Sequence, residues 1–149
     1  MEQIPSDEEV CVASLADRDS VVAIDEDVFD GTDFLAATYP SLVEGPGTRG
    51  YILKKECKTI AFLNTQLIDG GRTLLQSTGR VAPEYRGTGV LGRFRRLIRN
   101  KYIGTPNLCY IAFTVSDLIM TATGQKLLRT NRQVTEKVCY TLRMLQNML

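Results

Sequence analysis

The sequence predicts a single domain of the α/β or α+β class, built on a mixed β-sheet. Segments with strand and helix patterns follow one another in the order β-α-α-β-β-β-α-β-α-β, which is typical of a sheet with helices packed on it. The 149 residues match the usual size of one domain, and 44% hydrophobic against 23% charged residues is ordinary globular usage. No repeat and no linker divides the chain, so we expect one domain over residues 1–149.

The first third of the chain predicts one strand and two helices. Partly alternating apolar residues favour a strand at 10–15, and aspartates suited to capping precede a helix at 17–27. A second helix is expected at 34–43, kinked or cut at Pro40, because proline cannot donate a helical hydrogen bond. The run Gly45-Pro46-Gly47 ends it.

The rest of the chain predicts mainly strands around one clear helix. The run Asp69-Gly70-Gly71 is a strong hairpin signal between two β-rich segments. In the helix at 90–102, apolar residues gather on one face and arginines lie elsewhere. We expect strands at 51–53, 59–68, 73–81, 108–115 and 137–145, and a further helix at 117–128.

The chain contains no histidine, and its four cysteines include no CxxC pair. A Cys/His zinc site is therefore not expected, nor is Ser-His-Asp or Cys-His nucleophilic chemistry. Any general base must be a carboxylate, a tyrosine, a chain terminus or a water chain. Free thiols, an acidic start without signal-peptide features and the lack of a long apolar run predict a cytoplasmic protein with no metal and no membrane partner.

Charge is distributed unevenly along the chain. The first 48 residues hold twelve acidic residues and one basic residue, Arg18, whereas the remainder holds five acidic and seventeen basic ones. Such asymmetry indicates either ligands of opposite charge on two sides of the protein or two parts of one fold that attract each other. Both interpretations remain open at this point.

A glycine-rich turn joins a predicted strand to the amphipathic helix, over residues 79–92. Glycine permits positive φ and close approach of the backbone, and amide N–H groups at a helix N-terminus favour an anion. The spacing is neither GxGxxG nor GxxxxGK[ST]. The turn therefore predicts a phosphate or pyrophosphate site, the alternative being an ordinary strand-to-helix connection.

The run Val81-Ala82-Pro83-Glu84-Tyr85-Arg86-Gly87-Thr88-Gly89-Val90 resembles motif A of the GNAT N-acetyltransferases, whose core is Arg/Gln-x-x-Gly-x-Gly/Ala. The resemblance implies a GNAT-like mixed, mostly antiparallel sheet with helices on both faces, and acetyl-CoA as cosubstrate. It also implies that the loop amides hold the pyrophosphate and that the strand end pairs with the pantetheine arm. The expected coenzyme-binding residues are Arg80, Val81, Ala82, Arg86, Gly87, Thr88, Gly89, Val90 and Leu91.

Leu91 departs from this pattern, because the family has glycine or alanine at its position. A leucine there could crowd the phosphates or point into the core. Its spacing with Phe94 and Ile98 on one helix face favours the core.

The segments 29–35 with Tyr39, 69–73 and motif A together resemble the histidine N-acetyltransferase branch, also called probable N-acetyltransferase 16-like, over about residues 12–142. Members of that branch are longer, so we expect a fragment or a short paralogue. The resemblance implies a small amine acceptor, first histidine or another free amino acid, and Asp33 and Tyr39 as substrate-binding residues. Asp33 could equally cap the helix that follows it. The carboxylate of an amino acid would also need a cation, and Arg72 and Arg80 are candidates.

The catalytic groups are only partly assigned. The resemblance implies that the backbone amide of Val81 stabilises the oxyanion. The branch carries a glutamate on the same strand, where this chain has Gln76-Ser77-Thr78, and residues 112–139 contain no tyrosine to protonate the leaving thiolate. General base and acid therefore remain unassigned, with a water relay through Ser77 or Thr78 as a candidate. A non-catalytic coenzyme A-binding domain is the alternative.

Basic residues follow motif A closely. They could form a nucleic-acid footprint, but few aromatic residues lie among them. We expect them to be solvated or to serve the coenzyme's phosphates, with no nucleic-acid partner. The cluster comprises Arg86, Arg93, Arg95, Arg96, Arg99 and Lys101.

Overall fold

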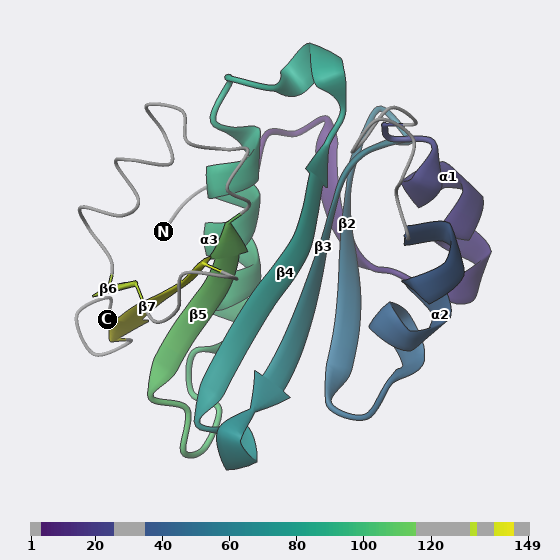
Figure 1. Cartoon of the computed structure of the whole chain (residues 1–149). Coiled ribbons are helices and arrows are strands. Elements are labelled where there is room, and N and C mark those ends of the chain that lie inside the picture. Colours follow the sequence, from purple (N-terminus) through teal and green to yellow (C-terminus); the bar gives the residue numbers. More distant parts are fainter. Residues whose placement is uncertain (1–3, 26–34, 116–131, 134–138, 145–149) are drawn as a thin grey trace. The chain divides into compact units, whose positions relative to one another are not determined.

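The computed structural model describes residues 4–25, 35–115, 132–133 and 139–144 (Figure 1). By its internal contacts the chain forms two compact units, one of Met1–Thr65 with Thr78–Ile103, the other of Gln66–Ser77 with Gly104–Leu149. The expectation of a single domain over residues 1–149 stays a prediction.

The first unit holds β1 (Glu8–Val12), β2 (Thr48–Lys55), most of β3 (Lys58–Ile68) and the end of β4 (Thr73–Val81). Their hydrogen-bonded order is β1-β2-β3-β4, and β1 pairs antiparallel to β2. The β2–β3 turn places Glu56 and Cys57 at φ of 48° and 67°, the left-handed conformation that tight hairpins require at both central positions.

Helices cover both faces of this part of the sheet: α1 (Arg18–Val22) and α2 (Leu35–Glu44) on one side, α3 (Val90–Tyr102) on the other (Figure 1). Neighbouring residues of a strand point to opposite faces. Phe62 of β3 lies 5.8 Å from the Tyr39 ring of α2, centroid to centroid. Its neighbour Leu63 and Leu91 of α3 both lie 3.4 Å from the position that a Cβ on Gly79 would occupy. This confirms helices on both faces and a core-directed Leu91.

Pro40 lies inside α2 without cutting it, which corrects part of our expectation. Proline has no N–H to donate to the carbonyl four residues earlier, here that of Ala36. Arg18 replaces the missing donor, because its Nε donates to the Ala36 carbonyl at 3.1 Å. The helix therefore continues across the proline.

The second unit is built on a parallel pair flanked by antiparallel pairs. The first part of β4 pairs parallel to β5 (Tyr110–Val115), with a register from Thr73↔Tyr110 to Gln76↔Phe113. Beyond β5 follow β7 (Cys139–Met144) and β6 (Arg132–Gln133), each in antiparallel pairing. The sheet is thus mixed and mostly antiparallel, as predicted. The helix expected at 117–128 lies outside the described residues.

The strongest local patterns predicted their elements best. The bounds of β4 and α3 agree with the expected ranges, whereas β1 begins two residues before the expected 10–15 and ends at Val12. No helix in the described part of the chain is long and apolar enough to cross a lipid bilayer.

Candidate functional site

The loop between β4 and α3 keeps its backbone open to solvent. A short 3-10 turn at Pro83–Tyr85 leads into Gly87 and Gly89, whose φ values of 75° and 82° lie in the left-handed region. A Cβ added at either glycine would meet nothing within 4 Å. The left-handed backbone conformation therefore favours glycine at these two positions, and the space in front of the loop stays free for a ligand.

The amides at the start of α3 are left for an external acceptor. The first helical hydrogen bond runs from the Arg93 amide to the Gly89 carbonyl at 3.0 Å, so the amides of Val90, Leu91 and Gly92 have no intrahelical partner. No side chain caps this helix, and the Thr88 hydroxyl donates to the Tyr85 carbonyl. The first turn also lacks acidic residues. This donor set fits a pyrophosphate.

The strand end before this loop presents the backbone of Val81 away from β3. The Ala82 amide donates to the Ile60 carbonyl of β3 at 2.8 Å. Because N–H and C=O groups of successive strand residues point to alternate sides, those of Val81 point to the opposite side of β4. The Nε of Arg86 donates to the Val81 carbonyl from there at 3.3 Å. An added strand-like ligand would find the Val81 N–H on this side.

Thr78 distorts the backbone of β4 just before this strand end. Its φ is 53°, an uncommon and strained conformation for a β-branched residue. The register of β4 with β5 reaches Gln76, and β4 itself continues to Val81. Nothing in the sequence signals this distortion. Ser77 precedes it and is partly buried, and its role as a water relay stays a prediction.

Arg86 of motif A is engaged within the protein. Its Nη2 forms an ion pair with the carboxylate of Asp25, which follows α1 and has a side chain only 10% exposed. Arg80, Val81 and Ala82 have buried side chains, so what they can offer a coenzyme is chiefly backbone. Coenzyme contacts of all these residues stay predictions.

The two expected substrate residues have different outcomes. Asp33 lies outside the described residues. Tyr39 is fully buried, and its hydroxyl donates to the Ser14 carbonyl at 2.7 Å. Burial, and after it the charge of Asp17, raises the pKa of Tyr39 to about 12. These are the contacts of a core residue, and a role of Tyr39 toward substrate stays a prediction.

The two candidate cations for an acceptor carboxylate, Arg72 and Arg80, belong to different units. In the second unit the Arg72 guanidinium lies 5.9 Å from the centroid of the Tyr110 ring. In the first unit Arg80 is only 8% exposed. Neither arginine lines the pocket described next.

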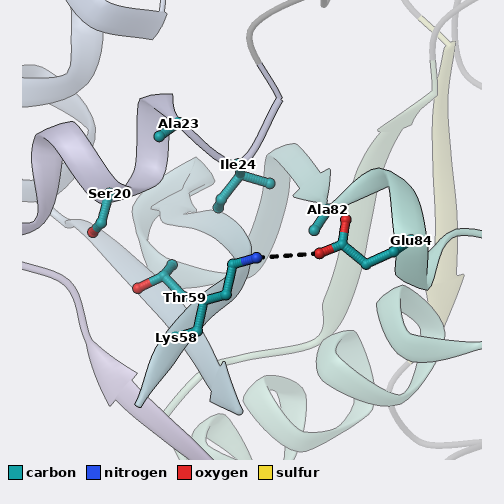
Figure 2. A pocket seen from close by; sticks show the side chains of 7 residues that line it. All are labelled: Ser20, Ala23, Ile24, Lys58, Thr59, Ala82 and Glu84. Atoms are coloured by element: carbon teal, nitrogen blue, oxygen red, sulfur yellow. Dashed lines mark hydrogen bonds and ion pairs between the residues drawn. The ribbon is translucent and has the colours of Figure 1, made fainter. Parts of the chain in front are cut away.

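A pocket of about 290 Å³ lies at the same end of β4, within the first unit (Figure 2). Its apolar wall comes from the end of α1 and from Ala82. Lys58 and Glu84 face each other across it, with Nζ and Oε1 3.3 Å apart. Sequence reasoning missed this site, because its parts come from three segments without a shared motif. The polar lining residues are Ser20, Thr59, Lys58 and Glu84.

The arginines of α3 do not form one solvated face. Arg93 reaches Glu8 of β1 at 2.8 Å, and the Glu8 side chain is only 3% exposed. Burial lowers the pKa of Arg95. These two guanidiniums are therefore not displayed to solvent as a nucleic-acid footprint requires.

No known protein-family model matches the chain. A stretch of 95 residues, 61% of the chain, is 35% identical to a histidine N-acetyltransferase of Scomber australasicus and spans 28% of that protein. The chain thus matches less than a third of the length of its curated relatives. The sequence resemblance predicted above is confirmed.

Solved structures show the fold. An acetyltransferase from Thermus thermophilus superposes with a TM-score of 0.72 at 14% identity, covering 93% of this chain and 97% of that one. The PaiA N-acetyltransferase from Thermoplasma acidophilum, in complex with coenzyme A, gives 0.68 at 10% identity, covering 92% and 98%. The chain has the GNAT acetyltransferase fold, as predicted.

Proposed function

We propose that this chain binds acetyl-CoA and transfers the acetyl group to the amine of a small metabolite, with histidine or another free amino acid as first candidate. The observation that carries the proposal is the uncapped start of α3, which follows, after the glycine-containing loop, the strand end where Val81 presents its amide away from β3. The likeness to histidine N-acetyltransferases and the coenzyme A complex of a protein of the same fold support it.

Each part of the site has a task in this proposal. The loop from Arg86 to Leu91 binds the pyrophosphate through its amides. The strand end at Arg80, Val81 and Ala82 pairs with the pantetheine arm through the backbone groups of Val81, which face away from β3. When bound, acetyl-CoA supplies a thioester carbonyl that an amine attacks. The Val81 amide donates to the oxygen on which charge develops, and one such donor typically contributes a factor of about 100 to 1,000 in rate.

Proton transfer requires a group that accepts the proton of the attacking amine. The segment Gln76-Ser77-Thr78 carries no carboxylate. A water held by Ser77 is our candidate for accepting the amine's proton. The same observation favours a second candidate function, a domain that binds coenzyme A without turnover.

The proposed setting is cytoplasmic. Among the described residues Cys11, Cys57 and Cys109 are free thiols, which suits a reducing compartment.

Acetyl-CoA titration followed by an acceptor panel tests the proposal. We expect a rise in melting temperature with micromolar affinity, and acetylation of free amino acids but not of lysine peptides or protein N-termini. Binding without turnover on any acceptor would favour the non-catalytic domain. Absence of coenzyme binding would overturn both. Submicromolar binding of DNA or RNA with a steep salt dependence would establish the nucleic-acid alternative.

A further inference from the structure

The pocket of Figure 2 has one charge of each sign on its rim, and its remaining wall combines apolar with hydroxyl-bearing side chains. Lys58 comes from the start of β3, and Glu84 from the turn after β4. Ile24 and Ala82, which line the interior, are 6% and 3% exposed. Ala82 directly follows Val81, so the pocket begins one residue from the proposed oxyanion donor.

The ion pair on the rim is easily replaced by a ligand. The side chains of Lys58 and Glu84 are 71% and 53% exposed. Ion pairs this exposed contribute little to stability, so little is lost when the two side chains separate. A hydrogen bond from its own backbone amide and, next, the contact with Lys58 lower the pKa of Glu84. Glu84 is therefore charged at neutral pH.

We propose that this pocket binds the ammonium and carboxylate groups of a free α-amino acid, with Lys58 pairing the carboxylate and Glu84 pairing the ammonium. Thr59 lines the same space, and its hydroxyl can donate to the remaining carboxylate oxygen, whereas the Ser20 hydroxyl already donates to the Asp17 carbonyl at 2.9 Å. On binding, the exposed ion pair between Lys58 and Glu84 is replaced by two ion pairs with the ligand. The identification of this amino acid as the acetyl acceptor rests on the proposed function, whereas its binding does not.

The pocket is small. Its volume of about 290 Å³ lies at the lower end of the range for small-molecule sites and is enough for one amino acid. A peptide N-terminus lacks the adjacent carboxylate that Lys58 requires. The pocket thus supplies the cation that neither Arg72 nor Arg80 brings to it.

Four related ligands separate the two contacts: histidine, histamine without the carboxylate, N-acetylhistidine without the ammonium, and histidine amide. Binding is measured by calorimetry on the whole chain with Lys58→Ala and Glu84→Gln. Exposed Lys101→Ala and Glu44→Gln serve as charge-matched controls. We expect Lys58→Ala to weaken histidine about fivefold and leave histamine unchanged. Glu84→Gln should weaken histidine and histamine about equally and leave N-acetylhistidine unchanged. Both controls should bind like the parent.

The possible outcomes distinguish the amino-acid site from the proposed function. Equal weakening of all four ligands by either variant, or tight histamine binding that Glu84→Gln does not change, would overturn the assignment. So would coenzyme binding without amino-acid binding, which leaves the proposed function standing. Amino-acid binding that follows the expected pattern, together with no acetyl-CoA thermal shift, would support the pocket and overturn the proposed function. Unchanged melting temperatures of the variants show that folding is not the cause.

Discussion

Arg86 joins the end of α1 to the end of β4, because it forms an ion pair with Asp25 through Nη2 and donates from Nε to the Val81 carbonyl at 3.3 Å. Motif A alone suggests a phosphate ligand at this position. In this structure the guanidinium instead links two backbone segments, and we call this link the Arg86 strut. Its partner carboxylate is largely shielded from solvent, so the pair is worth more than a surface ion pair.

Asp25→Asn tests the strut. We expect a loss of about 1–2 kcal/mol in the free energy of unfolding, since Arg86 is half exposed and keeps part of its hydration. Arg86→Gln should lose more, because it also removes the hydrogen bond to the Val81 carbonyl, and the double variant should lose no more than Arg86→Gln alone. Urea denaturation measures all three. Asp19→Asn, which removes a carboxylate 95% exposed, is the control and should change little. Additive losses at Asp25 and Arg86 would show that the two residues act separately.

Gly89→Glu should abolish the stabilisation by acetyl-CoA. The substitution puts a negative charge and a side chain at the position where the start of α3 presents its amides, and strains a left-handed backbone of φ 82°. Thermal-shift titration of the folded variant measures the effect.

Gly70→Glu is the matched control for this test. Gly70 also has positive φ, 62°, and open space around its Cβ position, so it carries a similar strain and the same charge in the β3–β4 turn. It should lose stability comparably and keep the full coenzyme shift. A full shift in Gly89→Glu would place the coenzyme elsewhere on the protein.

Glu8→Ala should destabilise the protein by about 3 kcal/mol, because it leaves the largely buried Arg93 without its carboxylate. Asp7→Ala removes the neighbouring carboxylate, whose pair with Lys55 is 3.6 Å long and well exposed. That loss should stay below about 1 kcal/mol. Equal effects in chemical denaturation would mean that burial does not distinguish the two pairs.

Alkaline pH should weaken the fold between about pH 10 and 12. The pKa of Tyr39 is raised from 10 to about 12 in the folded protein, so the unfolded chain releases this proton first and unfolding becomes easier as pH rises through that window. Burial, followed by a hydrogen bond with Tyr102, has the same effect on the pKa of Tyr51, to about 12. In Tyr39→Phe the decline should be shallower, and shallower still with Tyr51→Phe added. An unchanged slope in denaturation experiments would contradict buried, neutral tyrosines.

Local signals made β4 and α3 predictable. A turn sequence precedes β4, a glycine-rich loop separates it from α3, and α3 has a strongly apolar face. The contact between Asp25 and Arg86 and the pocket of Figure 2 could not be predicted in this way. Asp25 and Arg86 are 61 positions apart, and Lys58 and Glu84 are 26 apart. Only tertiary folding brings such residues together. The surrounding structure likewise imposes the strained positive φ of Thr78, and a threonine within a β-rich segment gives no sign of it in the sequence.

The contact of Arg18 with the Ala36 carbonyl makes Pro40 a tolerated irregularity rather than a break in α2. The two positions are therefore linked by compensation: proline removes a donor, and arginine supplies one. If Pro40 were replaced by a residue with a backbone N–H, that N–H could donate to the Ala36 carbonyl. Arg18 would then no longer be needed as a donor and could vary. Among related sequences the two positions should consequently change together, a pattern of covariation that originates in a single carbonyl oxygen.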